Sequence, residues 1–154
     1  MNNNYTSELD HKYRTLAIVW LILLMSQMVF IGVAFSVKGG MVSGGEGSEP
    51  TDTEPAIIAA FALLAVINFV LSFVMRRRAM QQAIAEKNVA HVQTGLVLGC
   101  ALCESISIIG VVLAIAFAYP YFYLWIALGM LGIFLHFPRR KDLYDANAGK
   151  MTAN

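Results

Sequence analysis

The sequence is poor in charged side chains. Of its 154 residues only 14% are charged and 58% are hydrophobic, and the mean hydropathy is +0.63. A soluble domain carries about 25% charged residues, so this chain lacks the polar surface that a water-facing domain needs. Its length leaves room for one membrane domain and none for a separate soluble domain.

The sequence also lacks the motifs of soluble enzymes. It has no phosphate-binding loop, nucleotide fingerprint or nucleophile motif, and His11, His91 and His136 show no metal-ligand spacing. Cys100 and Cys103 lie three positions apart in one apolar run, where helical geometry disfavours a mutual disulfide, so we interpret both as packing residues. We therefore expect no enzymatic activity, no metal or organic cofactor and no small-molecule substrate.

What the sequence does contain is four long apolar runs, of 23, 21, 24 and 18 residues: Thr15–Val37, Pro55–Met75, Gly95–Ala118 and Pro120–Phe137. A membrane-spanning helix needs about 20 apolar residues. The first run exceeds the 7–15 residues of a signal-peptide core, so we expect it to remain as a span. The predicted fold class is an all-α membrane protein, an antiparallel four-helix transmembrane bundle.

The basic residues predict the orientation of this bundle. Ten of the eleven lysines and arginines flank run ends that lie on one side, and only Lys38 lies on the other. Because positive loops stay cytoplasmic, both termini and the 76–94 loop are expected inside, with Arg76, Arg77 and Arg78 as interfacial anchors. Topology accounts for these charges, so no nucleic-acid partner is expected. The expected organisation is a cytoplasmic segment 1–14, a transmembrane domain 15–137 and a cytoplasmic tail 138–154, in a plasma membrane of bacterial inner-membrane type.

The connecting segments differ in composition. Residues 38–54 are rich in Gly, Ser and acidic residues, which predicts a flexible exterior linker. Residues 76–94 contain neither Gly nor Pro and favour a helical hairpin with its tip at Lys87-Asn88. The proline and aromatic residues of 119–125 predict a tight turn at the level of the lipid headgroups.

Glu104 is the one charged side chain inside the four runs. A charge at a bilayer centre costs about 2.5–3.5 kcal/mol, and such residues mark ion or proton paths. Glu104 lies ten residues beyond Thr94, or about 15 Å into the membrane at 1.5 Å per residue. The first and second runs place polar side chains at a similar depth. The candidate ion-binding residues are Glu104, Ser105, Ser107, Asn68, Gln27 and Ser26.

Small residues recur every three or four positions in the third run, which predicts close helix packing. The candidate packing residues are Gly95, Gly99, Cys103, Gly110 and Ala114. The second run has a milder series at Ala62, Ala65, Asn68 and Ser72. If the second and third runs pack tightly, Asn68 is expected to come close to Glu104.

Residues 101–114, ALCESISIIGVVLA, resemble the carboxylate-bearing helix of the rotary ATP synthase proteolipids, the c subunits. Sodium-dependent members of that family carry a serine or threonine after the glutamate, as Ser105 does here, and a glutamine from a partner helix, a role open to Gln27. The resemblance covers about 15 residues and implies binding of H⁺ or Na⁺. The second run lacks the glycine-repeat stripe of the proteolipid inner helix.

Two functions follow as expectations. In the first, the chain is a small proteolipid-like membrane protein whose carboxylate binds or relays H⁺ or Na⁺ within a larger membrane complex. In the alternative, it is a structural four-helix protein in which Glu104 is a protonated, hydrogen-bonded packing residue. Either function implies contact with membrane lipid and with further membrane proteins, in a homo- or hetero-oligomer.

Overall fold

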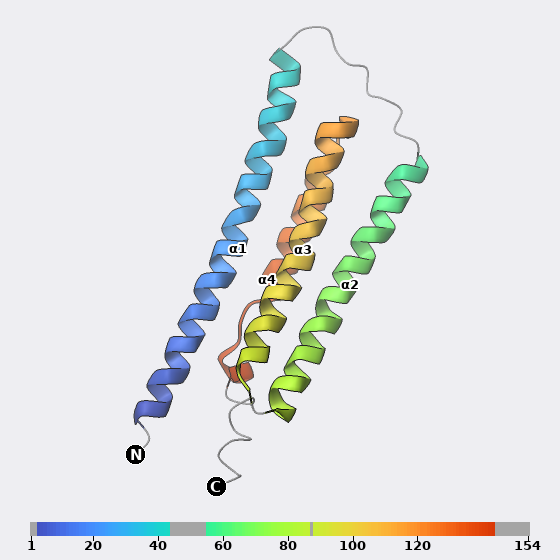
Figure 1. The fold of residues 1–154 in the computed structure, drawn as a ribbon. Coiled ribbons are helices and arrows are strands. Elements are labelled where there is room, and N and C mark those ends of the chain that lie inside the picture. Colours follow the sequence, from blue (N-terminus) through green and yellow to red (C-terminus); the bar gives the residue numbers. More distant parts are fainter. Residues whose placement is uncertain (1–2, 44–54, 87, 144–154) are drawn as a thin grey trace.

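The computed structural model describes residues 3–43, 55–86 and 88–143, and those residues form helices joined by short turns. The four main helices are α1 (Asn3–Ser43), α2 (Pro55–Ala85), α3 (Ala90–Phe117) and α4 (Phe122–Leu135). Figure 1 shows the three long helices running alongside one another, with α3 between α1 and α2 and with α4 behind α3.

The central helix of the bundle is α3, which packs against each of the other three helices, while α4 also packs against α1. In the most apolar stretch of α3, 50% of the residues are buried inside the protein, against 11% in α1 and 11% in α2. The two flanking helices therefore direct most of their apolar side chains outward, as Val29 and Leu63 do, each 63% exposed.

Three of the helices, α1, α2 and α3, are long and apolar enough to cross a membrane. Their outward apolar side chains have no place in water but suit a lipid environment or the surface of other membrane helices. The chain is a multi-pass helical membrane protein. The coarse prediction, an all-helical membrane bundle, is confirmed.

The fourth helix is shorter than predicted. The expected span was 120–137, whereas α4 has 14 residues, or about 21 Å at the helical rise, against a hydrocarbon core of about 30 Å. Both ends have a physical cause. Pro120 lies in the turn before the helix, and at the other end the N–H of His136 donates to Gly132 O (3.2 Å) and Ile133 O (3.0 Å). Pro138, two residues later, cannot continue the helical hydrogen bonding.

The first helix is longer than predicted. It begins at Asn3, inside the expected 1–14 segment, and continues to Ser43, so the prediction of a linker is wrong for residues 38–43. The stretch contains no proline, and a helix tolerates a glycine at a cost of about 1 kcal/mol. The rest of the predicted linker, 44–54, lies outside the described residues.

The two remaining connections agree with the predictions. A helical hairpin joins α2 to α3, and the side chain of Asn88 accepts a hydrogen bond from the N–H of Ala90 (3.0 Å) at the start of α3. The other residue of the predicted tip, Lys87, lies outside the described residues. The turn between α3 and α4 is tight: Ala118 has a left-handed backbone conformation (φ 49°, ψ 25°), and its N–H donates to Leu113 O.

Candidate functional site

Glycines bring α3 and α4 into backbone contact. A Cβ atom added to Gly129 of α4 would lie 2.7 Å from the carbonyl oxygen of Cys103 and would also collide with the hydroxyl of Ser107. A Cβ atom at Gly110 of α3 would lie 2.9 Å from the carbonyl oxygen of Phe122. Hydrogen is the only side chain that fits at either position, and this fixes the side of α3 that faces α4.

The packing residues predicted on α3 are all buried: Gly95, Gly99, Cys103, Gly110 and Ala114. These residues do not all pack against the same helix. A Cβ atom at Gly95 would lie 2.5 Å from Cβ of Ala79 on α2, whereas one at Gly99 would lie 2.6 Å from the ring of His136, just after α4. The matching glycines on α4, Gly129 and Gly132, were not predicted, although their three-residue spacing in an apolar run was the available signal.

Glu104 lies at the contact between α3 and α1, where it is half-buried. Its Oε1 atom is hydrogen-bonded to the hydroxyl of Ser26, which is also 2.6 Å from the carbonyl oxygen of Leu23. A hydroxyl group has one proton to donate. Ser26 can therefore donate to Oε1 of Glu104 or to the Leu23 carbonyl oxygen, but to only one of them at a time.

A second polar pair joins the same two helices. The hydroxyl of Ser107, one turn along α3, donates to Oε1 of Gln27 on α1 (2.5 Å). Both side chains are fully buried, and the Nε2 atom of Gln27 has no hydrogen-bond partner among the described residues. Gln27 is thus the partner of Ser107, and the adjacent residue Ser26 is the partner of Glu104.

Asn68 is placed differently from the prediction. Its Nδ2 atom donates to the hydroxyl of Ser105 (3.0 Å), which in turn donates to the carbonyl oxygen of Leu102 (2.7 Å). Consecutive residues of a helix point about 100° apart, so Ser105 faces α2 while Glu104 faces α1. Asn68 was expected to come close to Glu104; it binds the next residue of α3, and no hydrogen bond joins Asn68 to Glu104 among the described residues. The six candidate residues form three separate pairs and no common cage.

Glu104 forms no ion pair within the described part of the chain. In that same part, no group of three or more His, Cys, Asp or Glu side chains lies close enough to hold a metal ion. Cys100 and Cys103 are buried free thiols. The site is therefore a single carboxyl group with a hydroxyl partner, in the middle of a helix whose other side is closely packed.

One further contact fixes α1 against α4 near this site. The indole Nε1 of Trp20 donates to the carbonyl oxygen of Ile133 (2.8 Å) in the last turn of α4, where this oxygen also accepts from the N–H of His136 (3.0 Å). Comparisons with protein-family models, with curated proteins and with solved structures find no match to this chain.

Proposed function

We propose that this protein is a non-enzymatic, proteolipid-like membrane subunit that binds and relays a proton at Glu104 within a larger ion-translocating complex. The observation that carries the proposal is the position of the Ser26 hydroxyl between Glu104 and the Leu23 carbonyl oxygen. That position suits a carboxyl group holding a proton, and loss of the proton would still leave Ser26 able to donate to the carboxylate. The pair accommodates both states of a proton carrier.

The same contacts favour H⁺ over Na⁺. A bare cation such as Ca²⁺ is held by six to eight oxygen ligands, and Na⁺ likewise requires several. Near Glu104 the Ser26 hydroxyl is one such oxygen, whereas the amide oxygen of Gln27 accepts from Ser107 and the amide of Asn68 is held by Ser105 on the side of α3 that faces α2. A proton needs one acceptor and one donor, which this pair supplies.

The surroundings of the site support a role inside a complex. Glu104 is half-buried, and the neighbouring helices α1 and α2 bury only 11% of their most apolar stretches. In the proposed arrangement, with α4 as a fourth short span and both termini in the cytoplasm, Glu104 lies near the bilayer centre. An ionisable group at that depth marks a proton path by default, and partner helices on the open faces would complete such a path.

A purely structural role is the second candidate. It is favoured by the Asn68–Ser105 pair, which links α2 to α3 in the same manner as Ser26–Glu104 links α1 to α3. Interhelical hydrogen bonds of this type stabilise membrane proteins by about 0.6 kcal/mol each. Under this proposal Glu104 remains protonated at all times and exchanges no proton.

Carbodiimide labelling of native membranes across a pH series separates the two candidates. The reagent attacks a protonated carboxyl group in an apolar setting. For a proton carrier, labelling of Glu104 is strongest at low pH and falls as the pH rises and the carboxyl loses its proton, and sodium does not block it. Glu104→Gln is the unlabelled control. Ser26→Ala, which removes the hydroxyl partner, is expected to move the pH at which labelling falls.

Three outcomes are informative. Labelling that is absent at every pH, or constant across the series, contradicts a proton carrier and supports the structural role. If sodium suppresses the labelling, the ion bound at Glu104 is Na⁺ and the assignment to H⁺ is wrong. Loss of labelling with rising pH, together with a shifted profile in Ser26→Ala, supports the proposal.

A further inference from the structure

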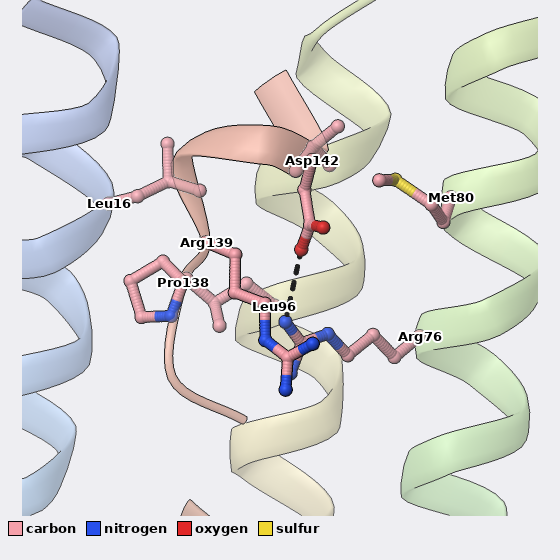
Figure 2. Close-up of a pocket in the computed structure, with 8 residues that line it drawn as sticks. Leu16, Arg76, Met80, Leu96, Pro138, Arg139 and Asp142 are labelled. Carbon is pink, nitrogen blue, oxygen red and sulfur yellow. Dashed lines mark hydrogen bonds and ion pairs between the residues drawn. The ribbon is translucent and has the colours of Figure 1, made fainter. Parts of the chain in front are cut away.

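A small cavity lies at one end of the bundle, lined by α1, α2, α3 and the segment that follows α4 (Figure 2). Its apolar lining includes Leu16 of α1, Met80 of α2 and Leu96 of α3. Its charged lining consists of Arg76 of α2 together with Arg139 and Asp142, which follow α4. Residues 63 positions apart in the sequence, Arg76 and Arg139, thus share one site.

The cavity lies at the edge of the apolar layer. Leu16 and Leu96 are the second residues of the first and third apolar runs, and Arg76 directly follows the second run. Three independent segments therefore place the cavity at the same boundary, where lipid headgroups meet the hydrocarbon core. Any ligand here is presented with a polar group on one side and apolar helix surface on the other.

Arg76 is held in place by the end of α4. Its guanidinium donates to the carbonyl oxygens of Leu135 (3.3 Å) and Phe137 (3.2 Å), which have no helical partner there, and to Oδ2 of Asp142 (3.2 Å). An arginine suits this position because helix C-termini carry partial negative charge. These contacts use three of the five N–H donors of a guanidinium group, so two remain.

Of the two arginines that line the cavity, Arg139 is the one without a counterpart among the described residues. Its guanidinium makes no hydrogen bond or ion pair with any residue in the described ranges, and it lines the same cavity as Arg76 (Figure 2). The next residue, Arg140, points elsewhere: its guanidinium forms an ion pair with Asp10 (Nη1 to Oδ1, 3.6 Å) and lies over the ring of Tyr13. Asp142 offsets one of the two cavity guanidiniums, so the cavity retains one unit of positive charge.

We propose that this cavity binds the phosphate group of an anionic membrane phospholipid, with Arg139 and the two remaining donors of Arg76 as its ligands. Guanidinium groups match phosphate oxygens in charge and in planar, paired donor geometry. Basic pockets between membrane helices at the cytoplasmic face bind anionic headgroups. The acyl chains would lie on the exposed apolar surfaces of α1 and α2. The inference is independent of a proton at Glu104.

The test compares the melting temperature of the full-length protein in detergent with added phosphatidylglycerol and with added phosphatidylcholine. Phosphatidylglycerol is expected to raise the melting temperature above the phosphatidylcholine value. Arg139→Gln should weaken the apparent affinity for phosphatidylglycerol about fivefold. Arg77→Gln is the matched control, because Arg77 is exposed beside Arg76 and does not line the cavity. Asp142→Asn removes the competing carboxylate and should strengthen the affinity.

Because each variant is compared with itself in two lipids, a general loss of stability cancels. Equal affinities in Arg139→Gln and Arg77→Gln, or no difference between the two lipids in the unmodified protein, would overturn the proposal. A separate arm with inorganic phosphate and no lipid identifies the source. If free phosphate alone reproduces the stabilisation, the site takes a soluble anion and the assignment to a phospholipid is wrong.

Discussion

The two sides of α3 are built on different principles. Towards α4, glycines let the backbones meet, and a Cβ atom at Gly129 would lie 2.7 Å from a carbonyl oxygen. Towards α1, the contact includes two polar pairs, Ser26–Glu104 and Gln27–Ser107. In a membrane, helices associate without a hydrophobic driving force, through close packing and through interhelical hydrogen bonds. This protein uses the first mechanism mainly on one side and the second mainly on the other.

The glycine contact with α4 fixes the position of α3, whereas the contact with α1 carries the ionisable side chain. Closely packed backbones permit few alternative arrangements, so the α3–α4 contact holds α3 in one position. Ser107 of the second pair also lies against Gly129, whereas the Ser26–Glu104 pair has no member in the glycine contact and can change its hydrogen bond without moving it. A carboxyl group that gains and loses a proton is better placed on the second side, and Glu104 is found there.

The largest effect is expected at the glycine contact. Gly129→Ala forces apart the backbones of α3 and α4 and should lower the free energy of unfolding by about 1–3 kcal/mol, the usual cost of overpacking. Gly32→Ala is the matched control, because nothing lies within 4 Å of a Cβ atom at Gly32; this variant should be stabilised by up to about 1 kcal/mol through helix propensity. Unfolding by a denaturing detergent in mixed micelles measures both. Equal effects of the two substitutions would remove the distinction between the two sides of α3.

The next largest effect is expected at Ala118, in the turn that joins α3 to α4. Ala118 has φ 49°, a left-handed conformation that costs a residue with a Cβ atom about 1–2 kcal/mol. Ala118→Gly should therefore stabilise the protein by about 1 kcal/mol, measured by the same unfolding assay. Ala116→Gly, on an exposed position of α3, should destabilise it by a similar amount. Destabilisation by both substitutions would show that the turn has no strain to relieve.

The number and approximate position of the helices could be predicted from the sequence, because they depend on local signals: the length of each apolar run and the positions of prolines. The apolar runs, the hairpin after Arg76 and the turn at Pro120 all follow from such signals. The helix ends were less accurate. The helix α1 continues through Gly39 and Gly40 to Ser43, although their composition predicted a linker, and α4 ends at Leu135, three residues before Pro138, where its last carbonyl oxygen accepts from Arg76.

The candidate residues were recognisable, but their pairing was not. Depth along a helix predicts which side chains share a layer, and Glu104, Ser26 and Asn68 were selected in this way. Direction around the helix depends on which face of α3 each neighbour occupies. Asn68 contacts Ser105 and not Glu104 because α2 and α1 lie on different sides of α3 (Figure 1). The pairing of Arg139 with Arg76 at one cavity required the tertiary structure for the same reason.

The smallest effect is expected for a single interhelical hydrogen bond, the one between Asn68 and Ser105. Asn68→Ala and Ser105→Ala each remove the hydrogen bond between α2 and α3 (3.0 Å), and a double-mutant cycle should give a coupling of about 0.6 kcal/mol, the average for such bonds in membrane proteins. Asn68→Ala combined with Ser26→Ala is the control. Those two residues contact different sides of α3, and their effects should add.

The size of this coupling decides how the polar links compare with the glycine contact. A value near 0.6 kcal/mol, against a larger loss in Gly129→Ala, makes the polar pairs minor contributors to stability and leaves Glu104 free to serve as a proton carrier at little structural cost. A coupling of 2 kcal/mol or more (about the loss expected for Gly129→Ala) would make the polar links as important for the fold as the glycines. If the Ser26–Glu104 link were of the same strength, the structural role of Glu104 would become the better account, because the carboxyl group could not exchange its proton without loosening the bundle.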